Sequence, residues 1–224
     1  MSNPRNLKII AKIKSDFPTK FGIPRQSGLA PSLTAKIVFE KEFQSQEALS
    51  GLENFSHIWL IWGFSEAAQE SWSPTVRPPR LGGNQKAGVF ATRSPFRPNS
   101  LGLSAVKIEK IENGEIFVSG ADLMDGTPIY DIKPYLPAID SITSATDLFN
   151  ENAVKTPLKV TISDELTDMI RADKLASLKE ILALDPRPAY QNDPLRIYGF
   201  QFAGHEIKFK VEENILTIIS VEKI

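Results

Sequence analysis

A long stretch of the chain carries positive charge without any acidic side chain. No Asp or Glu occurs between Glu70 and Glu109, whereas the stretch contains Arg77, Arg80, Lys86, Arg93, Arg97 and Lys107. Its prolines and the Gly82-Gly83 pair indicate irregular loops, which often carry functional side chains. Cations near the aromatic residues Trp72 and Phe96 would suit a phosphate backbone and an unstacked base. A solvated loop whose arginines pair with distant acids is the alternative.

Two turns carry polar groups that could hold a small ligand. Gly22-Ile23-Pro24-Arg25-Gln26 offers a cation and an amide on a backbone restricted by proline. It could bind a carboxylate or the edge of an adenine, or it could be an ordinary surface turn. Asp122-Leu123-Met124-Asp125-Gly126-Thr127-Pro128 places two carboxylates three residues apart after a strand. These carboxylates could accept hydrogen bonds from ribose hydroxyls, or they could simply cap the turn.

A third polar group follows the main helical pattern of the chain. Asp185-Pro186-Arg187-Pro188-Ala189-Tyr190 combines a carboxylate, a guanidinium, two prolines and an aromatic ring. The run is similar to the Asp/Asn-Pro-Pro-aromatic clamp of amino-methyltransferases, in which acceptors engage an exocyclic amine while a ring stacks on the base. A proline turn that only ends the helix is the alternative.

Alternation of apolar and polar residues predicts the elements that must position these groups. The first part of the chain contains strand-like segments at 8–13, 34–39, 58–62, 101–108 and 116–119. Short strands separated by Pro and Gly turns favour a closed antiparallel sheet, because closure removes exposed edges. We therefore expect a mainly β protein in which residues 1–145 form a β-barrel-like domain.

The pattern changes in residues 146–224. A strand at 158–162 leads to Ser163, a residue suited to cap a helix, and apolar residues then recur at helical spacing up to Asp185-Pro186. Beyond this helix, strands of a small meander are predicted at 196–202, 205–211 and 215–221. We expect a small C-terminal α+β domain that carries the turn starting at Asp185.

Missing residue types and motifs exclude several classes of protein. With no cysteine and only His57 and His205, the chain cannot form a disulfide or a three-histidine metal site, and we expect no metal. The Gly-x-Gly-x-x-Gly and Gly-x-x-x-x-Gly-Lys motifs are absent, which disfavours a Rossmann or P-loop enzyme. Lysines interrupt the apolar residues 7–13, and the apolar run 58–64 is too short to cross a membrane. We expect a cytoplasmic protein without membrane contact.

The ordered motifs of the chain resemble those of one protein family. The motifs are Phe21–Gln26, Pro74–Asn84, Val89–Asn99, Asp125–Pro128, Asp131–Tyr135 and Asp185–Tyr190. On these runs the chain resembles the TrmO family, also called TsaA or YaeB-like. The resemblance implies an S-adenosylmethionine-dependent tRNA (adenine-N6)-methyltransferase. Its substrate would be N6-threonylcarbamoyladenosine at position 37 in the anticodon loop of threonine tRNA, and its product m6t6A. The resemblance also implies a non-Rossmann β-barrel methyltransferase domain and a homodimer.

The resemblance assigns roles to individual residues as well. Cofactor contacts map onto Pro24, Arg25, Gln26, Ser65, Glu66, Arg93, Leu103, Asp122, Leu123, Met124 and Asp125. Enterobacterial members of the family carry histidine at the position of Ser65, so the side chain differs there. We expect contacts to RNA phosphates or to the threonylcarbamoyl carboxylate from Arg77, Arg80, Arg97 and Arg187, together with Arg93.

In-line transfer of the sulfonium methyl group to N6 is the mechanism we expect, with the protein mainly orienting both partners. The N6 lone pair is delocalised into the adenine ring, so an acceptor near the amine must receive its proton. We assign Asp185 and Tyr190 to that region, and the implied homodimer suggests that they act across a subunit boundary. The alternative function is a non-catalytic RNA-binding β-barrel module that uses the adenosyl ligand only as a regulator.

Overall fold

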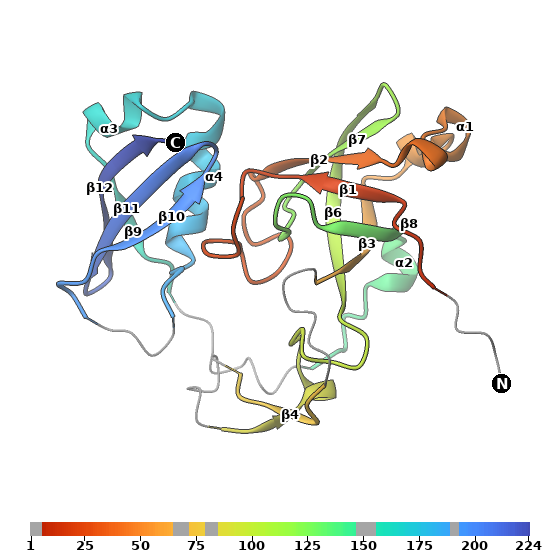
Figure 1. The fold of residues 1–224 in the computed structure, drawn as a ribbon, viewed down its shortest axis with the longest axis horizontal. Helices are drawn as coiled ribbons and strands as arrows, with labels where there is room; N and C mark the ends of the chain where they lie inside the picture. Colours follow the sequence, from red (N-terminus) through yellow and green to blue (C-terminus); the bar gives the residue numbers. More distant parts are fainter. Residues whose placement is uncertain (1–5, 65–71, 79–84, 147–155, 189–192) are drawn as a thin grey trace.

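The fold combines a closed barrel and a smaller open sheet, which lie side by side in Figure 1. It is seen in a computed structural model that describes residues 6–64, 72–78, 85–146, 156–188 and 193–224. Helices are few and short, and the two sheets have separate apolar cores. The expected mainly β fold with a small α+β unit is confirmed.

Six of the described strands close the barrel in the order β1-β2-β7-β6-β3-β8. Their bounds are β1 Ala11–Lys14, β2 Thr34–Phe39, β3 His57–Gly63, β6 Leu101–Glu112, β7 Glu115–Ser119 and β8 Pro128–Pro134. All of these pairings are antiparallel. In β1, Ala11 and Ile13 are buried whereas Lys12 and Lys14 are exposed. Because successive side chains of a strand point to opposite faces, this alternation buries one face in the barrel core.

Closure of the barrel depends on β8, which the alternation did not predict. This strand pairs with both β3 and β1, for example through Ile132 with Leu60 and Ile129 with Ala11. Proline at both ends of the segment argues against a strand in a sequence, since proline is rare inside sheets. Here each proline occupies a strand end, where the constraint is weakest.

The C-terminal sheet has the order β10-β11-β12-β9. Its strands are β9 Lys159–Thr161, β10 Tyr198–Phe202, β11 His205–Glu212 and β12 Ile215–Lys223. The last three form the expected antiparallel meander, and β9 runs parallel to β12. Phe200, Phe209 and Leu216 are buried on one face of the sheet. That face forms the core of the C-terminal domain.

Two helices precede the meander, with bounds α3 Asp164–Asp168 and α4 Ala172–Ala183. The predicted cap at Ser163 is confirmed, because its hydroxyl accepts a hydrogen bond from the Leu166 N–H. Helix α4 packs Leu178 into the C-terminal core and ends just before Asp185, which has a positive φ of 56°. The predicted helix end at Asp185-Pro186 is therefore confirmed.

Residues 15–33, which we call the bridging segment, link β1 to β2 and lie between the two sheets (Figure 1). They leave the barrel after β1 and return to it at β2, and in Figure 1 they run between the two sheets. Phe17, Ala30 and Leu33 are buried in the core of the C-terminal domain rather than in that of the barrel. The predicted domain boundary at residue 145 stays a prediction, but the C-terminal core includes side chains from both sides of it.

Polar contacts also hold the bridging segment on α4. Lys174 Nζ lies 2.6 Å from Asp16 Oδ2, and both side chains are mostly buried. Glu180 accepts hydrogen bonds from the Ser32 backbone N–H at 2.9 Å and from its hydroxyl at 2.7 Å. Moving the segment away from α4 would break the buried Lys174–Asp16 ion pair and leave an uncompensated charge, which is costly. These contacts therefore hold the bridging segment against α4.

The remaining described elements are short. They are η1 Lys41–Phe43, α1 Gln46–Leu49, η2 Leu52–Asn54, β4 Thr75–Val76, β5 Ala87–Gly88, η4 Val89–Ala91 and α2 Pro137–Asp140. Strands β4 and β5 pair as a small hairpin that projects at the lower edge of Figure 1. Within the ranges that the structure describes, no helix is long and apolar enough to cross a membrane.

Candidate functional site

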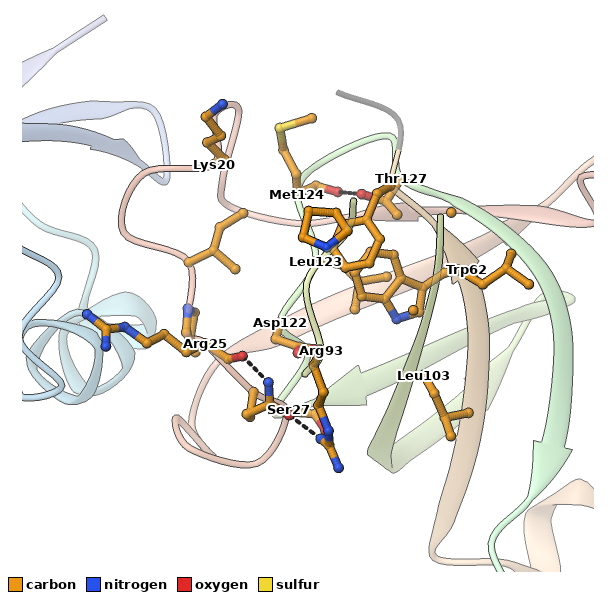
Figure 2. A pocket seen from close by; sticks show the side chains of 18 of the residues that line it. Lys20, Arg25, Ser27, Trp62, Arg93, Leu103, Asp122, Leu123, Met124 and Thr127 are labelled. Atoms are coloured by element: carbon orange, nitrogen blue, oxygen red, sulfur yellow. Dashed lines mark hydrogen bonds between the residues drawn. The ribbon is translucent and has the colours of Figure 1, made fainter. Parts of the chain in front are cut away.

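A cavity of about 710 Å³ lies between the barrel and the bridging segment (Figure 2). Its size is within the range of roughly 300–1,000 Å³ that is typical of small-molecule sites. The walls come from the bridging segment, the ends of β3 and β6, and the loops 92–97 and 122–127. Most of the predicted cofactor residues line it, namely Pro24, Arg25, Gln26, Arg93, Leu103, Asp122, Leu123 and Met124.

Gln26 and Arg93 join two walls of this cavity. The Arg93 guanidinium donates a hydrogen bond to the side-chain oxygen of Gln26, and the Gln26 amide donates to the Arg25 carbonyl. Figure 2 shows Arg25 and Arg93 along one side of the cavity, where dashed lines mark these hydrogen bonds. Among the described residues, no acidic side chain forms an ion pair with Arg93. The positive charge of Arg93 is thus available to an anionic ligand group.

A chain of hydrogen bonds orients the Asp122 carboxylate at the cavity. Trp62 Nε1 donates to Ser104 Oγ at 2.9 Å, and the Ser104 hydroxyl donates to Asp122 Oδ1 at 2.6 Å. Burial raises the pKa of the Asp122 carboxyl, although the Ser104 hydrogen bond and the positive charge of Arg93 act to lower it. The barrel therefore presents a desolvated and oriented carboxylate to the cavity.

Glycine at position 102 allows the Trp62 ring to lie against β6. A Cβ atom at Gly102 would come within 2.3 Å of the Trp62 indole, so a larger residue would displace the ring and its bond to Ser104. Leu103 and Met124 add apolar surface to the wall. A site with apolar walls, one carboxylate and three guanidinium groups suits a small ligand that carries both kinds of charge.

Other predicted cofactor residues do not face the cavity or cannot be placed. Asp125 is not part of the cavity wall. Its carboxylate accepts a hydrogen bond from the Ser15 N–H at 3.0 Å and lies 3.4 Å from Lys14 Nζ. This arrangement ties the 122–127 loop to the start of the bridging segment. Ser65 and Glu66 lie outside the described residues, so their roles stay predictions.

The turn that starts at Asp185 approaches the cavity through Arg25. The Arg25 guanidinium donates to the Arg187 carbonyl at 3.5 Å, and in Figure 2 it points away from Asp122. Arg187 in turn donates to both Asp185 oxygens, at 2.7 and 3.0 Å, and these bonds raise the pKa of Arg187. Both side chains are nearly buried, and neither lines the cavity. The catalytic role of Asp185 and the RNA contact of Arg187 stay predictions, and Tyr190 lies outside the described residues.

The basic stretch supplies one further arginine to the cavity wall and another on the β4–β5 hairpin. Arg77 is exposed directly after β4, and Arg97 lines the cavity. The Arg97 guanidinium donates to the Thr92 carbonyl at 2.7 Å. In the part of the chain that the structure describes, neither arginine pairs with an acid, which disfavours a role limited to ion pairing. Arg80 lies outside the described residues.

Two residues of the site were missed by reasoning from the sequence. Trp62 was interpreted only as part of an apolar strand, and Ser104 only as part of the strand 101–108. The available signal was a serine on the inward-facing side of an apolar strand. Ser104 is 1% exposed, and a buried hydroxyl needs hydrogen-bond partners.

Comparison with known proteins identifies one family along the chain. The model of the tRNA-methyltransferase O N-terminal domain matches residues 12–141, and that of the TrmO C-terminal domain matches residues 155–224. The tRNA (adenine(37)-N6)-methyltransferase of Escherichia coli (strain K12) is 36% identical over an aligned length of 225, and the match covers 95% of this chain and 96% of the relative. An S-adenosyl-L-methionine-binding protein of Archaeoglobus fulgidus is 35% identical over 136 residues, which are 61% of this chain and 93% of that protein.

The fold agrees with these sequence matches. The crystal structure of TrmO from Pseudomonas aeruginosa superposes with a TM-score of 0.81 at 31% sequence identity, covering 100% of this chain and 99% of that one. Motifs on which the resemblance was based also build the cavity, since Phe21–Gln26 and Val89–Asn99 both contribute to its wall. Because the two family models together span both sheets, this chain belongs to the tRNA-methyltransferase O (TrmO) family.

Proposed function

We propose that this protein is an S-adenosylmethionine-dependent methyltransferase acting on tRNA. It methylates N6 of N6-threonylcarbamoyladenosine at position 37 of threonine tRNA and produces m6t6A. The observation that carries the proposal is the cavity in which Asp122 and Arg93 meet apolar walls, in a chain of this family. The name of the Escherichia coli relative supports the adenine position, and the motif resemblance supports the threonylcarbamoyl group.

The residues of the cavity fit S-adenosylmethionine. Arg93 would hold its carboxylate, and Asp122 would accept hydrogen bonds from its ammonium group or from a ribose hydroxyl. Leu103, Leu123 and Met124 would contact the apolar parts of the ligand. When bound, the cofactor supplies an electrophilic methyl group.

The protein must then align N6 with that methyl group and provide a destination for the N6 proton. Orientation alone removes roughly 7 kcal/mol or more of the activation barrier when the two reactants are well aligned. We propose that the turn of Asp185 and Tyr190 faces the amine, and that the Asp185–Arg187 pair holds the turn in place. Since Arg25 contacts the Arg187 carbonyl within one chain, we infer a site completed in the same subunit of a cytoplasmic homodimer.

Methyl transfer to defined tRNA tests this function. The protein is incubated with methyl-labelled S-adenosylmethionine and with threonine tRNA prepared with or without the threonylcarbamoyl group, and the nucleosides are identified by mass spectrometry. We expect m6t6A from the modified tRNA only. Arg93→Ala should weaken cofactor binding in calorimetry by about 1.5–3 kcal/mol, whereas Arg171→Ala, which removes an exposed arginine of the C-terminal domain, should leave it unchanged.

Two results would contradict the proposal. Cofactor binding without transfer to any tRNA would favour the non-catalytic RNA-binding module. Transfer to a different nucleoside would support a methyltransferase but reject the assigned position.

Sedimentation of the same preparation tests whether the protein is the proposed homodimer.

A further inference from the structure

Two aromatic rings are exposed side by side next to the cavity. Phe90 is 72% exposed and Trp72 is 49% exposed. Their ring centroids are 6.2 Å apart and the rings are stacked, with an interplanar angle of 26°. Single exposed apolar residues are common on protein surfaces, but a stacked pair of rings on a projecting hairpin is not explained by packing.

The hairpin holds the Phe90 ring outward by burying its neighbour. Val89 is 1% exposed, and its N–H donates to the Pro74 carbonyl at 3.0 Å. Pairing of Thr75 with Gly88 fixes the base of the same turn. Because η4 turns the chain directly after this anchor, Phe90 points to solvent on a restrained backbone.

A cation completes the exposed group. The Arg97 guanidinium lies 6.0 Å from the centre of the Phe90 ring, and its bond to the Thr92 carbonyl restricts it there. We call Trp72, Phe90 and Arg97 the aromatic platform. Phe90 remains mostly exposed, so these neighbours leave ring surface open to a ligand.

The charge around the platform indicates what it binds. No acidic residue occurs from position 71 to position 108 of the sequence, whereas Arg77, Lys86 and Arg93 occur in the same stretch as the platform residues. Aromatic faces combined with unopposed cations are the recognition surface for unstacked bases of single-stranded nucleic acid. A symmetric contact with a second copy of this chain would instead bring these like charges together.

The platform also adjoins the site of methyl transfer. Arg97 belongs to both, because it lines the cavity and lies over Phe90. We propose that the aromatic platform stacks on a nucleobase of the RNA substrate next to the adenosine that is methylated. The inference rests on the proposed function, and it adds a base-binding subsite to it.

Binding of a short RNA tests the platform separately from catalysis. The probe is a fluorescent anticodon stem-loop that carries N6-threonylcarbamoyladenosine, and its affinity is measured by anisotropy at several salt concentrations. Phe90→Ala should weaken binding roughly 5- to 100-fold without changing the salt slope, as expected for loss of one base–ring stack. Phe90→Tyr should bind like the wild type. Phe117→Ala, which removes a ring beside lysines on the barrel, is the matched control and should have no effect.

Abasic nucleotides locate the base. Stem-loops that lack the base on one or the other side of the modified adenosine are bound to wild type and to Phe90→Ala. We expect the penalty of Phe90→Ala to disappear with one of the two RNAs. An equal penalty with every RNA, wild-type affinity of Phe90→Ala, or a change only in the self-association of the protein would overturn the inference. Failure of the wild type to bind or methylate any stem-loop would instead reject the proposed function.

Discussion

Replacing Gly22 with alanine tests whether the C-terminal core positions the cavity wall at Pro24. Gly22 has a φ of +89°, a conformation that side chains other than glycine rarely adopt. An added Cβ would lie 2.4 Å from Cδ2 of Phe200, inside the C-terminal core. The strained backbone costs about 1–2 kcal/mol and overpacking a further 1–3 kcal/mol. We therefore expect Gly22→Ala to lower the free energy of unfolding by about 2–5 kcal/mol.

The same change should reach the cofactor through Pro24, which follows two residues later in the cavity wall. Urea unfolding measures stability, and calorimetry of the folded variant measures its affinity for S-adenosylmethionine, which we expect to fall about tenfold or more. Gly51→Ala is the matched control. Gly51 has a φ of +88° with no atom within 4 Å of the added Cβ, so only the strain of about 1–2 kcal/mol should appear.

A second substitution separates the clash from the strain. Phe200→Leu removes the ring atoms that the new methyl group meets. In a Phe200→Leu protein, Gly22→Ala should therefore lower the free energy of unfolding by less than it does in the wild type. Equal destabilisation of Gly22→Ala and Gly51→Ala would refute the steric part of this reasoning. Wild-type cofactor affinity in folded Gly22→Ala would refute the coupling between the C-terminal core and the cavity.

Four further predictions concern the cavity and the turn that starts at Asp185. Because the folded-state pKa of Asp122 is raised, its carboxylate lowers stability as pH rises above about 3.9, its usual unfolded value. Asp122→Asn should therefore be more stable than wild type at pH 7, and this difference in stability should be smaller at pH 4. The variant should also bind the cofactor more weakly. An equal difference in stability at both pH values would contradict this. Arg93→Ala should weaken cofactor binding by about 1.5–3 kcal/mol in calorimetry, and unchanged affinity in a folded variant would exclude the contact. Asp185→Asn and Tyr190→Ala should retain cofactor affinity but lose about 100-fold or more in turnover. Mixing Asp185→Asn with Arg93→Ala should not restore activity if each site is completed in one chain, and recovery after verified subunit exchange would show a shared site.

The sequence by itself determined the local elements and the family. Strands such as 34–39 and 215–221 follow from alternation, which needs only neighbouring residues and one buried face. The cap at Ser163 and the helix end at Asp185 are likewise local, because both depend on groups within a few residues. Composition marked the turn of Pro24 and the basic stretch of Arg93 as candidates, whereas their cofactor role came only from the motif resemblance.

Tertiary structure alone decided how these parts meet. Strand β8 closes the barrel through partners about 70 residues away in β3, and no local pattern contains that pairing. The orientation of Asp122 depends on Ser104 and Trp62 from two other strands. Phe17 and Gly22 pack on the C-terminal core, on strands more than 170 residues further along the chain. The physical reason is common to all three cases: apolar burial and the pairing of buried polar groups depend on residues brought together in space, whereas the alternation of a strand depends only on its own sequence.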